Sequence, residues 1–253
     1  MLVSLNDEDN MQMFDMRKFF AFWAVPLALF SCSKQYIIQG NSTVQSLDGK
    51  MLYLKTLKDN QLVNVDSCEV IHGQFEFSGT WDSTMMVNLF MDDESIMPLV
   101  LEEGNVQIHI DHAEQSVTGT PLNDTLYSFI HEKSRIDNQI AELSHKESQM
   151  IMDGMDHDEI LKILNEEAAR LNQKNDSLVI GFISKNFDNV LGPGVFMILT
   201  SSFPYPIITP QIDSLMSIAT PYFQNNSYVK EYMRLATENM ELMKERRDAG
   251  LGF

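Results

Sequence analysis

The chain has 253 residues, with 36 Asp and Glu against 18 Lys and Arg, and therefore a formal net charge of −18. Such a chain repels nucleic acid and anionic lipid head groups, so nucleic acid is excluded as a partner and a basic membrane-binding surface is excluded as well. It has two cysteines, Cys32 and Cys68, and no Cys-x-x-Cys pair. The chain by itself therefore cannot act as a dithiol oxidoreductase.

The N-terminal region contains an export signal. Arg17 and Lys18 precede an apolar run over residues 19–30, which is too short to span a bilayer. A basic start, a short apolar core and a small residue before the cleavage point are typical of a removed signal peptide. Leu29-Phe30-Ser31-Cys32 resembles the lipobox of bacterial lipoproteins, which implies cleavage after Ser31 and acylation of Cys32. The alternative is an ordinary cleaved signal that contains a cysteine by chance.

Residues 1–15 do not fit that signal, because they place acidic side chains where an export signal is basic. We expect translation to start at Met16, so that residues 1–31 comprise a mis-called start and the signal peptide. With Cys32 bound to lipid, Cys68 is the only thiol left. Its place in a strand-like run favours a small buried hydrophobe over a reactive thiol, which needs a basic or helix-terminal setting.

Residues 32–120 read as a β domain, because short runs of β-branched and aromatic residues alternate with turn residues. The pattern predicts an α+β fold that begins with an antiparallel β-sandwich of about eight strands. The predicted strands lie at residues 36–38, 51–57, 62–70, 74–77, 85–91, 96–101, 106–110 and 116–118.

Residues 121–253 read as a helical domain. Apolar residues at helical spacing run from Leu126 to Met150 and from Leu161 to Phe182, and Gly154 separates the two stripes. They predict a long antiparallel helical hairpin, in which Asp156 and Glu159 form a capping pair for the second helix. Further helices are expected over 195–202, from Pro210 to about residue 223, and over 228–248. Five methionines on these stripes are expected in the core, namely Met150, Met216, Met233, Met240 and Met243.

No catalytic motif is apparent, and the candidate metal ligands have simpler explanations. His109 and His112 lie three residues apart in a strand and its exit, which points them to opposite faces, so solvent-facing histidines are favoured over a zinc site. The acid-rich stretch 153–159 lacks the order of a calcium loop and reads as a solvated helix turn. We expect no metal and no cofactor.

Four tripeptides resemble the O-glycosylation sites of exported proteins in Bacteroides-type bacteria. Each consists of Asp, then Ser or Thr, then a third residue, and such short motifs also recur by chance. The candidate modified residues are Ser83, Thr125, Ser177 and Ser214.

Several short sequence segments, taken in chain order, look like a domain of unknown function found in Bacteroides-type lipoproteins. The segments are residues 49–54, 65–67, 72–79, 103–106 and 117–124. In that family a β-sandwich follows the lipobox, a helical segment comes next, and a thioredoxin-like domain of the peroxiredoxin (AhpC/TSA) type often closes the chain. The resemblance covers residues 35–130 well. This sequence ends at Phe253, where that last domain would begin, so the resemblance assigns no redox role to any residue here.

The functional expectation is a lipid-anchored cell-envelope protein that works as a non-catalytic binding or scaffold module. Its partners would be the membrane, through an acyl chain on Cys32, and an unknown envelope protein or ligand. The alternative is an accessory or truncated member of a periplasmic thiol–disulfide system. Ser33-Lys34-Gln35 lacks the acidic residues of a surface-export signal, so we expect an outer-membrane anchor that faces the periplasm.

Overall fold

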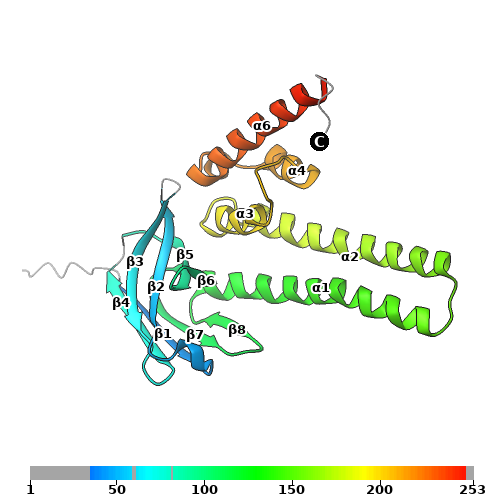
Figure 1. The fold of residues 1–253 in the computed structure, drawn as a ribbon. Helices are drawn as coiled ribbons and strands as arrows, with labels where there is room; N and C mark the ends of the chain where they lie inside the picture. Colours follow the sequence, from blue (N-terminus) through cyan, green and yellow to red (C-terminus); the bar gives the residue numbers. More distant parts are fainter. Residues whose placement is uncertain (1–34, 59–60, 81, 249–253) are drawn as a thin grey trace, which may run out of the picture. The chain divides into compact units, whose positions relative to one another are not determined.

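Two β-sheets followed by six α-helices make up the described part of the computed structural model, which comprises residues 35–58, 61–80 and 82–248 (Figure 1). The predicted start at Met16, the cleavage point after Ser31 and the acylation site Cys32 lie outside these residues. The predicted sandwich followed by helices is confirmed. None of the helices in these ranges is both long and apolar enough to cross a bilayer.

Each sheet has four strands. Sheet A has the order β4-β1-β7-β8, and sheet B has the order β3-β2-β5-β6. Neighbouring strands are antiparallel, as predicted, with the exception of β1 and β7, which pair in parallel. Between β1 and β7 the chain forms β2 and β3 of sheet B, β4 of sheet A, and β5 and β6 of sheet B, so a long connection joins the parallel pair, as parallel strands require. The strands are β1 (Gln35–Ser42), β2 (Met51–Lys58), β3 (Gln61–Glu69), β4 (Gln74–Thr80), β5 (Met85–Met91), β6 (Glu94–Leu101), β7 (Gly104–Ile110) and β8 (Gln115–Thr118).

The sandwich core forms where alternate side chains of the two sheets point inward. In β1 and β4 the buried residues Ile38 and Phe77 alternate with exposed polar ones, which is the period-2 pattern of a sheet with one wet face. Sheet B contributes to the same core with Leu52, Leu54 and Leu89, which are fully buried. Each such side chain contributes roughly 1.5–3 kcal/mol by leaving water.

The predicted helical hairpin is confirmed as α1 (Pro121–Met152) and α2 (His157–Lys185), which pack on each other. Asp156 caps α2 by accepting a 2.9 Å hydrogen bond from the backbone N–H of Asp158. Leu161 was expected on the buried stripe but is 40% exposed, whereas Ile160 is buried. Consecutive helix positions point about 100° apart, so only one of the two can face the partner helix.

The C-terminal helices are α3 (Leu191–Ser201), α4 (Pro210–Ile218), α5 (Pro221–Gln224) and α6 (Ser227–Asp248). The prediction of one helix from Pro210 to about residue 223 is wrong, because the chain becomes extended at Ala219 and Thr220. Pro221 disfavours helical backbone in the residue before it, and Thr220 caps the new helix instead.

Most of the methionines expected in the core occupy partly buried positions. Met216 and Met233 pack against the core, and Met150 and Met243 are partly buried. Met240 is 47% exposed, so its predicted core position is wrong. It lies on the part of α6 beyond Ala236, the last buried residue of that helix.

Candidate binding site between sheet B and the helices

A buried polar network joins the helices to the edge of sheet B. Asn123, in the first turn of α1, is fully buried; it accepts a 2.8 Å hydrogen bond from the backbone N–H of Val100 and donates one of 2.8 Å to the carbonyl oxygen of Val100. The carboxylate of Glu102 accepts the N–H groups of Leu122 and Asn123 at 3.0 and 3.1 Å. The Asn123 amide thus makes the two backbone hydrogen bonds that a further strand beside β6 would make. The Glu102 carboxylate accepts N–H groups at the start of α1 that have no partner within the helix.

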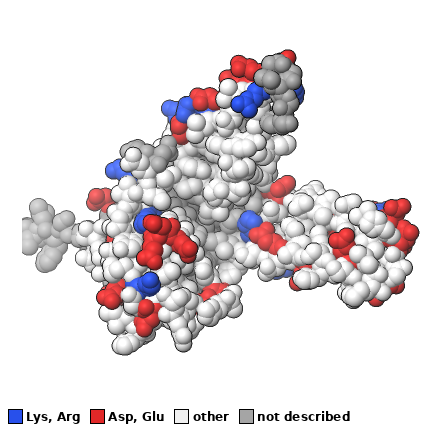
Figure 2. Space-filling model, in the orientation of Figure 1, with Lys and Arg blue, Asp and Glu red and all other residues white. Residues whose placement is uncertain are grey.

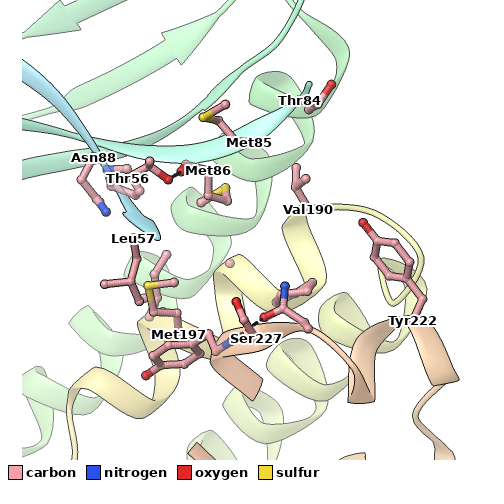
Figure 3. A pocket seen from close by; sticks show the side chains of 16 residues that line it. Thr56, Leu57, Thr84, Met85, Met86, Asn88, Val190, Met197, Tyr222 and Ser227 are labelled. Atoms are coloured by element: carbon pink, nitrogen blue, oxygen red, sulfur yellow. Dashed lines mark hydrogen bonds between the residues drawn. The ribbon is translucent and has the colours of Figure 1, made fainter. Parts of the chain in front are cut away.

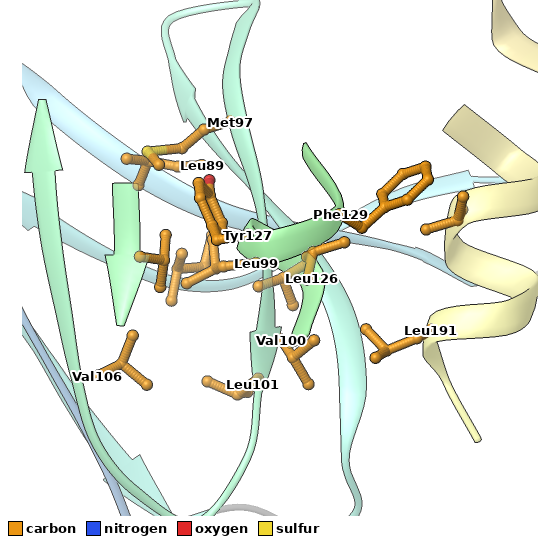
Figure 4. Close-up of a cluster of buried hydrophobic side chains, with 14 of the residues drawn as sticks. Leu89, Met97, Leu99, Val100, Leu101, Val106, Leu126, Tyr127, Phe129 and Leu191 are labelled. Carbon is orange, nitrogen blue, oxygen red and sulfur yellow. The ribbon is translucent and has the colours of Figure 1, made fainter. Parts of the chain in front are cut away.

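An apolar cluster reinforces this junction. Val100 on β6, Leu126 on α1 and Leu191 on α3 are all buried, and Figure 4 shows them around the start of α1. The hydroxyl of Tyr127 donates a 3.0 Å hydrogen bond to the carbonyl oxygen of Pro98. The start of the helical region is thereby held against the β6 side of sheet B.

Helix α3 approaches sheet B closely because it has a glycine at the contact. A Cβ atom on Gly194 would lie 2.5 Å from Cγ of Met86, well inside normal contact distance. Met86 lies on β5, and Gly192, Pro193 and Gly194 are all buried in the first turn of α3. The absence of a side chain at Gly194 therefore admits the methionine, whereas a Cβ atom on Gly192 would meet the backbone carbonyl of Asn186.

Beside this contact lies a cavity of about 190 Å³ between strands β2, β5 and β6 and helices α3, α5 and α6 (Figure 3). All of the described residues that line it are uncharged, and Figure 2 shows a largely uncharged surface around α3 and α4. The apolar lining residues are Leu57, Met85, Met86, Pro98, Val190, Pro193, Gly194, Met197 and Ile198. The polar ones are Thr56, Thr84, Asn88, Tyr222, Asn226, Ser227 and Tyr228.

Part of the polar lining is held by hydrogen bonds within the protein. Thr56 Oγ1 donates to the carbonyl oxygen of Met86 at 2.8 Å, and the hydroxyl of Tyr228 lies 2.8 Å from that of Thr200. Asn226 Oδ1 accepts the backbone N–H of Tyr228 at 3.1 Å, as the cap of α6. Tyr222 is 55% exposed and lies at the rim. The fixed groups shape the wall, while the rim side chain is free to adapt to a ligand.

The chemistry of this lining suits a neutral, amphipathic ligand. Ligand sites are commonly apolar with a few placed polar groups, and methionine side chains adapt to varied apolar shapes. A charged group placed here would lose water without gaining a counter-charge from the lining, which is costly. The site can thus hold an uncharged molecule or side chain.

The candidate glycosylation residues do not converge on this cavity. Ser83 lies in the β4–β5 turn, Thr125 in the first turn of α1, Ser177 within α2 and Ser214 within α4, and all four are exposed. Thr125 Oγ1 already donates a 2.7 Å hydrogen bond to the carbonyl oxygen of Pro121. Their modification stays a prediction.

The histidine expected to face solvent at position 109 contacts polar neighbours on the protein surface. His109 Nε2 lies 3.2 Å from a carboxylate oxygen of Asp111, and its other ring nitrogen contacts Asn41. The backbone N–H groups of Glu114 and Ala113, with His109, hold the pKa of Asp111 below its usual value. Within the described ranges, no three His, Cys, Asp or Glu side chains are grouped so as to hold a metal ion.

Cys68 is partly buried in β3 and packs against the core. Burial raises the pKa of its thiol to about 11; the nearby Asp66 adds to the rise, and a backbone hydrogen bond with Glu76 opposes it. Thiol chemistry needs the thiolate, which this setting disfavours at neutral pH. The alternative function, membership of a thiol–disulfide system, gains no support from Cys68.

The family comparison bears on the sandwich. Residues 36–126 match a family described as "Domain of unknown function (DUF4369)". This segment is therefore similar to the DUF4369 domain family, and we call it the DUF4369 domain for short. The match begins in β1 and ends in the second turn of α1, so the DUF4369 domain supplies the β-strand wall of the cavity while α3, α5 and α6 follow it. No curated protein matches the chain.

Proposed function

We propose that this protein is a lipid-anchored cell-envelope binding protein, held to the outer membrane on its periplasmic side by acylated Cys32, that takes a neutral amphipathic ligand in the cavity between sheet B and α3. The uncharged, methionine-rich lining is the observation that carries the binding role. The signal-like sequence that ends at Cys32 supports the anchor. Two acyl chains would be needed for firm attachment, because a single chain binds a bilayer only marginally.

The binding role can be tested with the neutral fluorescent probe N-phenyl-1-naphthylamine on the purified protein. We expect saturable fluorescence enhancement with micromolar affinity, which corresponds to about 8 kcal/mol of binding free energy. Met197→Arg places a charge in the lining and should weaken binding at least 10-fold. The matched control is Met152→Arg, at a position 79% exposed at the hairpin end, which should bind the probe as the wild type does.

A folded Met197→Arg protein that binds the probe with wild-type affinity would contradict the proposed site. Folding is checked by far-UV circular dichroism and thermal unfolding. Tyr222→Ala is a milder second variant at the exposed rim, and it should weaken binding by a smaller factor without affecting folding.

The anchor can be tested by growth with a radiolabelled or alkyne-tagged fatty acid. We expect the label on the wild type and on Cys68→Ala, and its loss from Cys32→Ala. Because the chain has only these two cysteines, the pair of variants is a matched test of the acylation site. Label retained on Cys32→Ala would overturn the anchor.

A further inference from the structure

The outward face of sheet A carries a set of amide, carboxylate and imidazole side chains on three adjacent strands. The residues are Gln74 and Glu76 on β4, Gln39 and Asn41 on β1, and Gln107 and His109 on β7. They alternate with buried residues such as Ile38, so all six point away from the core. We call these six side chains the amide face.

The strand register arranges the amide face in two rows. Gln39 lies opposite Glu76 on one side and Gln107 on the other, and Asn41 lies likewise between Gln74 and His109. Neighbouring strands lie about 4.8 Å apart, and the two rows are one pleat apart along each strand. A flat ligand that lies across the strands can thus meet several side chains at once.

Hydrogen bonds fix the orientation of the first row. Gln107 Nε2 donates to Gln39 Oε1 at 3.2 Å, and Gln39 Nε2 donates to Glu76 Oε2 at 3.0 Å. Each amide therefore retains outward-facing hydrogen-bonding capacity in a defined direction, because an amide has two donors and a two-acceptor oxygen. Side chains ordered in this way lose less conformational entropy on binding.

The amide face forms the floor of a shallow groove. Five of its residues line a surface hollow of about 630 Å³, together with Ile71 and His72 of the β3–β4 turn and Glu69. His72 has a φ of 53°, so the turn takes a left-handed step there. Ile71 is 59% exposed and offers an apolar contact beside the polar floor.

We propose that this groove binds a neutral oligosaccharide. Sugar hydroxyls both donate and accept hydrogen bonds, which matches amides and carboxylates in ordered rows. The described residues that line the groove include no Lys or Arg, so an anionic ligand would meet Glu69 and Glu76 instead of a counter-charge. The C–H face of a sugar ring has an apolar neighbour in Ile71. This site is on a different sheet from the cavity, and its failure would leave the cavity proposal intact.

The experiment is an NMR titration of the ¹⁵N-labelled protein with three neutral probes, cellohexaose, maltohexaose and chitohexaose, each to millimolar concentration. At least one probe should shift the side-chain amide signals of Gln39, Asn41 and Gln107 in a saturable way. Absence of such shifts with all three sugars would overturn the proposal, and so would shifts confined to other surfaces.

Variants then test the residues. The double variant Gln39→Ala with Gln107→Ala should weaken binding of the active sugar at least 10-fold. The control is Asn105→Ala, an exposed amide on β7 that faces the same way and lies outside the groove; it should bind like the wild type. Equal affinity of the double variant and the control would contradict the assignment.

Discussion

The two sheets of the sandwich share one core and differ in what covers their outer faces. Sheet A presents alternating exposed polar residues, and the side chains of Gln39 and Gln107 bond to each other at its surface. Sheet B presents Met86 to helix α3 at a distance that only a glycine permits. An apolar outer face therefore marks the side on which the helices pack, and a polar one marks the side left to solvent.

The difference also separates two kinds of binding surface. The cavity at sheet B requires both the DUF4369 domain and the helices after it, because its lining residues come from both. The amide face lies within the DUF4369 domain alone, between residues 39 and 109. A fragment with only the domain would keep the second surface and lose one wall of the first.

The most damaging change is expected at Asn123, which joins the helices to sheet B. Asn123→Leu leaves the N–H and C=O of Val100 without their partner and removes a donor from Glu102. We expect a loss of about 3 kcal/mol or more in unfolding free energy, measured by urea denaturation. The control is Asn138→Leu, an exposed position on α1, with a change within about 0.5 kcal/mol. An unfolding free energy that Asn123→Leu lowers no more than Asn138→Leu does would mean that this junction is unimportant.

A second change tests the close approach of α3 to sheet B. Gly194→Ala places a Cβ atom against Met86, and we expect a cost of about 1–3 kcal/mol together with weaker probe binding. Gly181→Ala, within α2, has open space around the added atom and should stabilise the protein by up to about 1 kcal/mol. Opposite signs at two helical glycines would confirm the contact, and two stabilised proteins would contradict it.

A third test concerns Cys68, on the strand of sheet B that lies beside β4. With a thiol pKa of about 11 instead of 9.0, the folded protein holds far less thiolate at pH 8. Iodoacetamide should react on the order of 100-fold more slowly than with the urea-unfolded chain. Because the folded pKa is raised, the stability contribution is complete below pH 9 and is lost as the pH rises from 9 through 11. Equal rates in the folded and unfolded chains would show an exposed, unperturbed thiol.

The smallest effect is expected on the face of sheet A. Gln107→Ala removes an exposed side chain whose hydrogen bond to Gln39 is open to water, so unfolding free energy should change by less than about 0.5 kcal/mol. A much larger loss would mean that the amide row has a structural role. The thermal midpoint, compared with that of wild type, is sufficient to decide.

Periodicity predicted the elements well where one pattern was long. Alternation around Phe75 and Phe77 indicated a strand with one wet face, and the 3–4 spacing from Leu126 onward indicated the hairpin. Both predictions depend only on the spacing of apolar and polar residues along a short stretch of chain. The break at Thr220 was missed because the apolar spacing continues past it, although Pro221 carried the signal. The parallel pairing of β1 with β7 depends on long-range assembly, which local patterns do not encode.

The candidate site was the least predictable part. Met86 and Gly194 lie more than a hundred residues apart and meet only after α3 folds onto sheet B. The run Gly192-Pro193-Gly194 signalled a helix start, but nothing in it indicated which surface it would face. Gln39 and Asn41 of the amide face lie beyond the strand predicted at 36–38, and the two rows depend on the register of three strands.

The most direct test of the contrast between the two sheets is a methyl spectrum of the protein labelled at its methionines, titrated with N-phenyl-1-naphthylamine. The methyl signals of Met85, Met86 and Met197 should shift in a saturable way, because these side chains line the cavity at sheet B. Met152 and Met240 are exposed elsewhere and should not shift. Shifts at those two positions, with none at the cavity methionines, would contradict the account.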